Sequence, residues 1–411
     1  MPRLTRDRTT WLTYAQLGLW GFFLYGFGPV VPLLRDEQGT SAAVAGLHST
    51  AVAAGALLGG ALFAPLARRF GRGPAIWLGL AGLAVGVTAF GTLRPLTATL
   101  AAVVVIATAG MMVISGVSVV ITARHGPAAP AALTEANAAC AGMGILAPLV
   151  IGASVGAGLG WRPVMAVEVG LIALVALTAR IFRVRLPQAA PATAAAAAPI
   201  GVTAPAAGAG GSDRLPRAYW IAWVLMAVTG SIEVCLSLWT ADVLRSHAGM
   251  TAAAASAAIA AIVCGMFLGR LVGGRIALRW PPAPLLLGAL SVSLVGFTLF
   301  WLAPVGWLAV TGLVVLGLGN ALHYPLAISI ALAVAGPAAD KAAGWASYSM
   351  GVGFGIAPVA LGAVADGIGP HLAFLALPGF IAAAVLLTVR LGRALQASAP
   401  APDRNPVPAG A

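Results

Sequence analysis

The sequence predicts an all-α integral membrane protein with twelve transmembrane helices in two parallel six-helix bundles. The first observation behind this prediction is composition: 60% of the 411 residues are hydrophobic and only 8% are charged. A soluble domain carries roughly 25% charged residues, so a water-covered globule is excluded. The second observation is a series of apolar stretches long enough to cross a membrane, and the third is an internal repeat.

The apolar stretches define the predicted helices, because a helix needs about 20 mostly apolar residues to cross a bilayer. In the first half of the chain they cover 11–34, 44–66, 75–93, 97–122, 132–157 and 163–182. In the second half they cover 218–243, 251–274, 284–303, 306–332, 342–364 and 372–391. The first stretch follows three arginines as a secretory signal would, but it is too long for one and lacks a cleavage site. We therefore expect it to remain as the first span.

The internal repeat appears when the sequence is shifted by 210 positions. Matching residues then coincide without a gap, among them Arg35 with Arg245, Gly55 with Gly265, Gly59 with Gly269, Pro74 with Pro284 and Pro148 with Pro358. Six helices repeated in the same orientation predict two bundles related by a pseudo-twofold axis along the membrane normal. Such an architecture places a solute site between the bundles, near the membrane midplane.

The repeat also predicts the domain organisation. We expect a first bundle over residues 1–183, a linker over 184–217, a second bundle over 218–395 and a tail over 396–411. The linker and the tail are rich in Ala, Pro and Gly and have no apolar periodicity, which is typical of disordered segments.

The net charge of +12 raises the question of a nucleic-acid partner, but the distribution of the charge favours membrane topology. If both termini are cytoplasmic, only four of the 23 Lys and Arg lie outside, namely Arg35, Arg94, Arg162 and Arg245. Arg270 is counted among the cytoplasmic loop residues. This bias follows the positive-inside rule. We therefore expect a multi-pass protein of the cell membrane, with cytoplasmic termini, a lipid bilayer around it and no nucleic-acid partner.

Motifs for enzymatic chemistry do not occur in the sequence. It contains no GxxxxGK[ST] phosphate loop, no nucleophile elbow and no HExxH metal motif. The three cysteines, Cys140, Cys235 and Cys264, lie in apolar runs without metal-ligand spacing. We expect no enzymatic activity, no metal and no cofactor, and a monomer.

The loop between the second and third spans carries a family resemblance. It reads APLARRFGR, in which Arg69, Gly71 and Arg72 match the loop Gly-x-x-x-Asp-Arg-x-Gly-Arg-Arg of the major facilitator superfamily. Arg68 stands where the family has the Asp that helps to latch the bundles. The chain also resembles that family in the number, orientation and repeat of its spans. The resemblance implies alternating access between the bundles and assigns Arg69, Gly71 and Arg72, with the repeat counterpart Arg279, to the cytoplasmic gate.

A second resemblance lies in the seventh span. Glu233 is followed six residues later by Trp239, then by Arg245 at the exit and by a helix containing GRLVGG. This pattern resembles the fucose-permease-like branch of the family, which is similar to sugar/proton symporters.

Glu233 is the main candidate for proton coupling. It stands about 15 residues into its span, roughly 22 Å along the helix axis, and a carboxylate at that depth normally faces a cavity, a partner or a proton. Thr229 and Ser237 lie four residues to either side, hence on the same helical face. The structural alternative is an acid that stays protonated and bonds to a neighbouring helix.

The tenth span supplies the main candidates for solute binding. Asn320, His323 and Tyr324 share one face and suit a hydroxylated solute, whereas hydrogen bonds between helices are the structural alternative. The remaining candidates are Ser237, Thr229 and Trp239 of the seventh span, Tyr348 of the eleventh, Asn137 of the fifth and Tyr25 of the first.

Charged residues elsewhere are expected to be structural. No Arg or Lys lies near the centre of a predicted span, which disfavours small anions as solutes. We expect Glu168 to pair with Arg162, and Glu135 with Arg124.

These features together predict a secondary active transporter that is coupled to protons as a symporter and moves a small neutral or hydroxylated organic solute. The alternative is a proton-driven exporter of hydrophobic or cationic drugs, with Glu233 as the counter-charge. A receptor or scaffold that transports nothing is the third reading, and only a measurement of solute movement would separate it from the first two.

Overall fold

The computed structural model describes residues 5–184, 186, 215–277, 279–335 and 339–397, and the regular elements in these ranges are all helices. The first half contains α1 (Arg8–Gln38), α2 (Ala42–Phe70), α3 (Arg72–Thr92), α4 (Leu96–His125), the 3-10 turn η1 (Gly126–Ala128), α5 (Ala129–Gly156) and α6 (Arg162–Ile181). The second half contains α7 (Arg217–Ser246), α8 (Ala252–Ala277), α9 (Pro282–Trp301), α10 (Gly306–Ala335), α11 (Ala339–Ile368), α12 (Pro370–Ala373) and α13 (Ala376–Ala397).

Within these ranges, 12 helices are long and apolar enough to cross a membrane, which confirms the predicted fold class. Each predicted span lies on one of them. The predicted linker (184–217) and tail (396–411) lie mostly outside the described residues.

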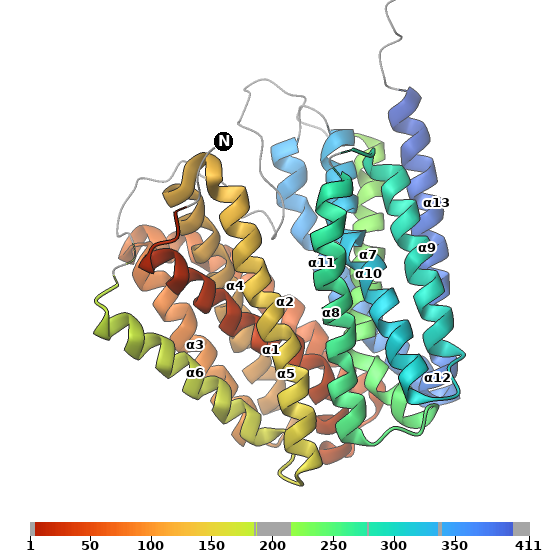
Figure 1. Cartoon of the computed structure of the whole chain (residues 1–411), viewed down its shortest axis with the longest axis horizontal. Coiled ribbons are helices and arrows are strands. Elements are labelled where there is room, and N and C mark those ends of the chain that lie inside the picture. Colours follow the sequence, from red (N-terminus) through yellow and green to blue (C-terminus); the bar gives the residue numbers. More distant parts are fainter. Residues whose placement is uncertain (1–4, 185, 187–214, 278, 336–338, 398–411) are drawn as a thin grey trace, which may run out of the picture.

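The two halves stand side by side, with α1–α6 in one and α7–α13 in the other (Figure 1). Their internal packing repeats in register. Gly55 of α2 packs directly against Val104 of α4, and Gly265 of α8 packs in the same way against Val314 of α10. Both members of the second pair lie 210 positions after those of the first. The packing therefore confirms the repeat, which sequence matches alone could only suggest.

The contacts between the halves obey the same repeat. Gly152 of α5 packs on the backbone of Ala253 at the start of α8, and Gly362 of α11 packs on the backbone of Ala43 at the start of α2. These positions also differ by 210. The two halves are thus related by a pseudo-twofold axis that runs between the α5–α8 and α2–α11 crossings.

We call the end of the molecule where α1 and α7 begin the termini-bearing end, and the opposite end the far end (Figure 1). At the far end, ion pairs join the halves. Arg35 of α1 pairs with Asp242 of α7, and Arg245 of α7 pairs with Asp36 of α1 at 2.8 Å. The two arginines are repeat counterparts. Asp242 is only 4% exposed, so the first pair is largely removed from solvent.

A helix cap adds to this closure. The Asp366 carboxylate of α11 accepts hydrogen bonds from the backbone N–H groups of Ala42 and Ala43, at 2.7 and 3.0 Å. These groups belong to the first turn of α2, where backbone donors have no partner inside the helix. The second half therefore caps a helix of the first.

Toward the termini-bearing end, α2 and α11 separate. The hydroxyls of Ser49 and Thr50 still donate to the carbonyl oxygens of Phe354 and Gly355, at 2.7 and 2.6 Å. Over residues 60–70 of α2, in contrast, only Phe63 is buried. The structure is thus closed at the far end and open at the termini-bearing end.

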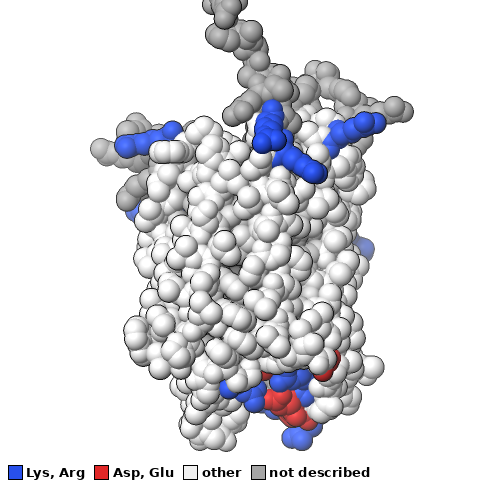
Figure 2. Space-filling view, turned by 90° about the vertical axis from the view of Figure 1, so that its right-hand side faces the viewer, with Lys and Arg blue, Asp and Glu red and all other residues white. Residues whose placement is uncertain are grey.

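The outer surface fits a lipid environment. The face in Figure 2 is largely free of charged side chains over its height, with Lys and Arg at the termini-bearing end and a mixture of acidic and basic side chains at the far end. Exposed side chains between these ends include Val85, Leu174, Val295 and Leu386. Apolar residues on a belt of this kind are expected where acyl chains replace water.

Candidate functional site

A cavity lies between the halves, lined by residues of α1, α2, α7, α8, α10 and α11. Its polar lining consists of Tyr25, Ser49, Glu233, Ser237 and Asn320. The rest of the lining is aliphatic or aromatic, apart from the thioether of Met266. A largely apolar cavity with a few converging polar groups is the usual form of a small-molecule site.

The crossing of α1 and α7 brings two of these polar groups together. A side chain at Gly28 would overlap the carbonyl oxygen of Ser237, so the two backbones touch there. Tyr25 and Glu233 each lie about one turn from this crossing, toward the termini-bearing end. They therefore face the cavity from opposite halves of the molecule.

Among the described residues, Glu233 has no hydrogen-bonded or ion-paired partner. Its side chain is half-buried, and it takes part in none of the ion pairs formed by the described residues. Tyr324 and Arg270 lie within electrostatic range of its carboxylate. The carboxylate thus points at the cavity and its solvent rather than at a bonded neighbour.

Arg270 is a cationic group of α8 that lies one helical turn after Met266 of the cavity lining, toward the termini-bearing end. Gly265 and Gly269 pack on α10, and Met266 and Arg270 each follow one of these glycines, so they are turned by about 100° toward the other half. Side chains of a helix also lean toward its N-terminus, which for α8 is the far end. The guanidinium accordingly reaches Tyr25 of α1 and lies within electrostatic range of Glu233.

This placement corrects the prediction made from the sequence. Arg270 was counted with the cytoplasmic residues although the predicted span 251–274 included it, and the structure likewise places it in the membrane-spanning part of α8, Ala252–Gly273. Arg270 lies three residues before the end of this span, so its backbone is not near the span's centre, but its side chain extends toward Tyr25 and Glu233. The argument against anionic solutes did not consider a side chain that reaches inward from the end of a span.

Two other predicted residues of α10 point in different directions. Tyr324 lies within electrostatic range of Glu233, and its hydroxyl has no hydrogen-bond partner among the described residues. His323 is buried and lies 3.0 Å from the hydroxyl of Ser293 on α9, away from the cavity. Of the predicted trio, the structure brings Asn320 and Tyr324 near Glu233 and uses His323 between helices.

The remaining predicted site residues lie outside the lining. The Thr229 hydroxyl donates to the Met226 carbonyl within α7, and the indole of Trp239 donates to the Pro358 carbonyl at 3.2 Å. The Asn137 amide donates to a carbonyl of its own helix at 2.9 Å. Tyr348 is 50% exposed, and its ring packs on Trp345 at a centroid distance of 5.3 Å.

The loop residues Arg69, Gly71, Arg72 and Arg279 lie at the termini-bearing end. Gly71 has φ 91°, a conformation that favours glycine, and it ends α2 and precedes α3. Arg69 lies over the ring of Phe70 at 5.3 Å. Among the described residues, no ion pair joins the halves at this end.

Two expected ion pairs are wrong. Arg162 pairs with Glu37 at 3.0 Å, while Glu168 is buried and neither of its carboxylate oxygens has a hydrogen-bond partner among the described residues. Arg124 pairs with Asp7, and Glu135 pairs with Arg6 at 2.5 Å. In each case the sequence placed the acid near a base but could not tell which helix the base would face.

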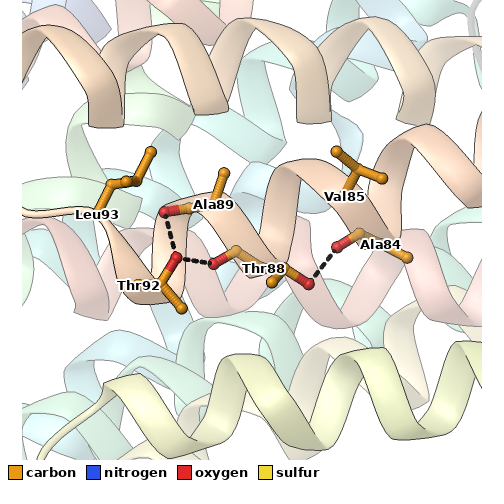
Figure 3. A pocket seen from close by; sticks show the side chains of 6 residues that line it. All are labelled: Ala84, Val85, Thr88, Ala89, Thr92 and Leu93. Carbon is orange, nitrogen blue, oxygen red and sulfur yellow. Dashed lines mark hydrogen bonds between the residues drawn. The ribbon is translucent and has the colours of Figure 1, made fainter.

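A second depression lies on the surface of α3, between Ala84 and Leu93 (Figure 3). Its hydroxyls, those of Thr88 and Thr92, donate to carbonyl oxygens one turn earlier in the same helix, at 2.8 and 2.7 Å. With its polar groups bonded internally, this surface offers a solute little beyond apolar contact. The described residues also contain no group of His, Cys, Asp and Glu that could hold a metal ion.

Comparison with known proteins decides the family. The sequence profile described as Major Facilitator Superfamily matches residues 15–339. The chain belongs to the Major Facilitator Superfamily. The resemblance seen in the loop between the second and third spans is thereby confirmed, and the protein is a multi-pass membrane transporter rather than an enzyme. No curated protein matches the chain in sequence.

Solved structures of superfamily members share the fold. A bacterial homolog of the human lysosomal transporter Spinster, inward-facing and unoccupied, has a TM-score of 0.74 at 16% identity, covering 97% of this chain and 99% of that one. A D-xylose–proton symporter has a TM-score of 0.73 at 13% identity, covering 93% and 96%. The E. coli fucose:proton symporter has a TM-score of 0.58 at 18% identity, covering 93% and 98%. At these identities the likeness shows the fold alone.

Proposed function

We propose that this facilitator-superfamily transporter couples the movement of a small hydroxylated organic solute to protons, with Glu233 as the proton carrier. One observation carries the proposal: Glu233 lies in the cavity lining, half-buried and without a bonded partner in the part of the chain that the structure describes. An ionisable residue inside a membrane is expensive unless it serves function. Asp242 in the same helix shows the structural alternative, because its carboxylate is held by Arg35.

The polar lining supports the choice of solute. Ser237 and Asn320 present hydrogen-bonding groups to the cavity. Tyr324 lies within electrostatic range of Glu233, and its hydroxyl has no partner among the described residues. All three come from the second half. The apolar remainder of the lining suits the carbon skeleton of the solute.

We further propose that the molecule spans the cell membrane as a monomer, with the termini-bearing end in the cytoplasm. The concentration of Lys and Arg at that end supports this orientation. Closure at the far end and opening at the termini-bearing end then correspond to the inward-facing step of alternating access. The cavity is formed within one chain, so a single copy suffices for transport.

Export of hydrophobic or cationic drugs is the second candidate, and the mostly apolar lining favours it. In that function Glu233 would be the counter-charge of the cation. Arg270 weakens this reading, because a guanidinium beside Glu233 repels a cation and already supplies a positive charge.

The test is solute-driven proton movement in proteoliposomes that contain the purified full-length chain and a pH-sensitive dye. The solutes are hexoses, polyols, hydroxylated carboxylates and cationic drugs. We expect one class to drive protons inward in the wild type, and Glu233→Gln to abolish this proton movement while solute exchange continues. Glu168→Gln is the matched control, since Glu168 is also a buried acid of a spanning helix but does not line the cavity.

Undiminished proton movement in Glu233→Gln would refute the role of Glu233. Outward proton movement driven only by cationic drugs would favour the exporter instead.

A further inference from the structure

We infer that Arg270 is the docking point for a carboxylate on the transported solute, so that the substrate class is small organic monocarboxylates. This inference rests on the proposed function and deepens it by naming the charge of the solute. It starts from the position of Arg270, which lies inside the membrane-spanning part of α8, one helical turn after Met266 of the cavity lining. Tyr25 and Glu233 lie within electrostatic range of its guanidinium.

Two partly buried arginines of the far end have carboxylate partners in direct contact. Arg35 pairs with Asp242, and Arg162 pairs with Glu37 and also donates to two backbone carbonyls. Arg270, in contrast, takes part in none of the ion pairs of the described residues. The side chain of Arg270 is exposed in this open conformation, so a solute can reach it. Its planar donors match a carboxylate. Glu233 lies within electrostatic range of Arg270 but forms no ion pair with it among the described residues.

Charge balance makes this arrangement a coupling device. In the empty transporter, Arg270 and Glu233 carry opposite charges and the site is neutral. With a proton on Glu233 and a carboxylate on Arg270, the site is neutral again. A proton alone would leave a net charge of +1, and a carboxylate alone a net charge of −1, and either charge is unfavourable within the membrane. The two neutral forms are therefore the ones that can reorient, and one proton accompanies each monoanion.

The rest of the cavity defines the remainder of the solute. Leu24, Phe27 and Ile262 line it beside Ser237 and Asn320. A dianion would leave a charge uncompensated, and an extended polyol would leave most of its hydroxyls against apolar side chains. The lining therefore fits a monocarboxylate with one or two hydroxyl groups and a compact apolar or aromatic body.

Binding to the purified full-length chain tests the inference. The probes are mandelate, lactate and benzoate, each compared with its uncharged amide by calorimetry and thermal stabilisation at pH 5.5 and pH 7.5. We expect the acids to bind and the amides not to, with tighter binding of the acids at pH 5.5. Arg270→Gln should weaken binding of the acids roughly ten- to hundredfold, and Arg270→Lys should retain part of it. Arg390→Gln, which removes an exposed arginine of α13, should leave it unchanged.

Glu233→Gln should raise the affinity for the acids, whereas Arg270→Gln should lower it. This second test does not depend on whether an Arg270 variant folds. Without the competing carboxylate, binding of the acids should strengthen about tenfold at pH 7.5 and lose its pH dependence. A residue that serves only packing would not produce this gain. Equal binding of acids and amides, no binding of any acid, or full binding by Arg270→Gln would each overturn the inference.

The outcomes also separate this inference from the proposed function. If hexoses or polyols drive protons through Glu233 while no acid binds, proton coupling stands and the carboxylate site falls. If the acids bind through Arg270 but Glu233→Gln still moves protons, the carboxylate site stands and the proton role of Glu233 falls.

Discussion

The ion pairs at the two ends of the molecule connect different parts of it. At the far end, Arg35–Asp242 and Arg245–Asp36 join the first half to the second. At the termini-bearing end, Arg6–Glu135 and Arg124–Asp7 join the start of α1 to α5 and α4, all within the first half. The far-end pairs must break whenever the halves move apart at that end. The pairs at the termini-bearing end can persist through the whole transport cycle.

This difference teaches how charge is used in a chain that has little of it. Only 11 residues of the sequence are acidic, and at the far end Asp36, Asp242 and Asp366 all make contacts between the halves. Charges at the far end therefore set the balance between conformations. Charges at the termini-bearing end hold the first bundle together as a rigid body.

The largest effect on this balance is expected from Asp242→Asn. Asp242 is buried and contacts both Arg35 and Arg245, and removal of one partner of a buried pair costs about 3–5 kcal/mol. The far end should open, because there the freed arginine regains water. Distance measurement by spin labels at Leu159→Cys and Trp307→Cys, in a background without the native cysteines, would detect the opening. These side chains are 67% and 71% exposed on different halves.

Glu37→Gln is the matched control for this experiment. Glu37 also lies at the far end and is paired, but its partner Arg162 belongs to the same half. An unchanged distance distribution in Asp242→Asn, or an equal opening in Glu37→Gln, would show that the pairs between the halves do not set the conformation.

A smaller effect is expected from Asp366→Ala, which removes the cap on α2. Loss of a charged cap typically destabilises a helix end by about 1 kcal/mol, and here the loss applies only to the closed far end. The same spin-label pair should show a partial shift toward longer distances. Asp366→Asn retains one acceptor oxygen and should lie between the wild type and Asp366→Ala; the reverse order would argue against capping.

The pair Arg245–Asp36 should contribute less, because its side chains are 32% and 39% exposed. Exposed pairs contribute about 0.2–1 kcal/mol. Arg245→Gln and Asp36→Asn should each widen the far-end distance slightly, and the double variant should widen it by less than the sum of the two single effects. A shortfall from additivity is the informative result, since two independent structural defects would add.

Much of the fold could be predicted from the sequence, because a bilayer imposes a minimum length on every apolar helix. The spacing argument also identified Glu233, Ser237 and Asn320, which the structure places in the cavity lining. A polar residue in the middle of a span normally faces the interior of the protein or a water-filled cavity. The repeat of 210 positions predicted the helix crossings in register, as the contacts of Gly55 and Gly265 show.

Partners across the molecule could not be predicted in the same way. Arg270 looks like a loop residue when distance to the helix end is the only criterion, and its direction follows from the glycine face of α8 against α10. That face was a signal in the sequence, since Gly265 and Gly269 are four apart. The contacts of Asp366 with α2 and the lack of a partner for Glu168 depend on helix rotations that the sequence does not encode locally.

The smallest effect on the distance between the halves is expected from Asp7→Asn, at the termini-bearing end. Asp7 caps α1 through the backbone N–H of Thr10 at 2.9 Å and pairs with Arg124. Partial burial alone would raise the pKa of Asp7, but the hydrogen bonds from Arg124 and Thr10 outweigh it and lower the pKa from 3.8 to about 2. A lowered pKa stabilises the fold above pH 4, and this stabilisation is lost as the pH falls from about 4 to about 2. The pair is also screened by solvent, so its contribution is about 1 kcal/mol or less.

Asp7→Asn should therefore leave the far-end distances unchanged at neutral pH, while making thermal stability less dependent on pH between 4 and 2. Asparagine keeps a capping oxygen for Thr10 but has no charge to lose. A melting series of both proteins from pH 5 to pH 2 would measure the difference in slope. Opening of the far end in the variant would show that Asp7 also affects the contacts between the bundles. A loss of stability in acid as steep as that of the wild type would show that the Asp7 charge does not stabilise the first bundle.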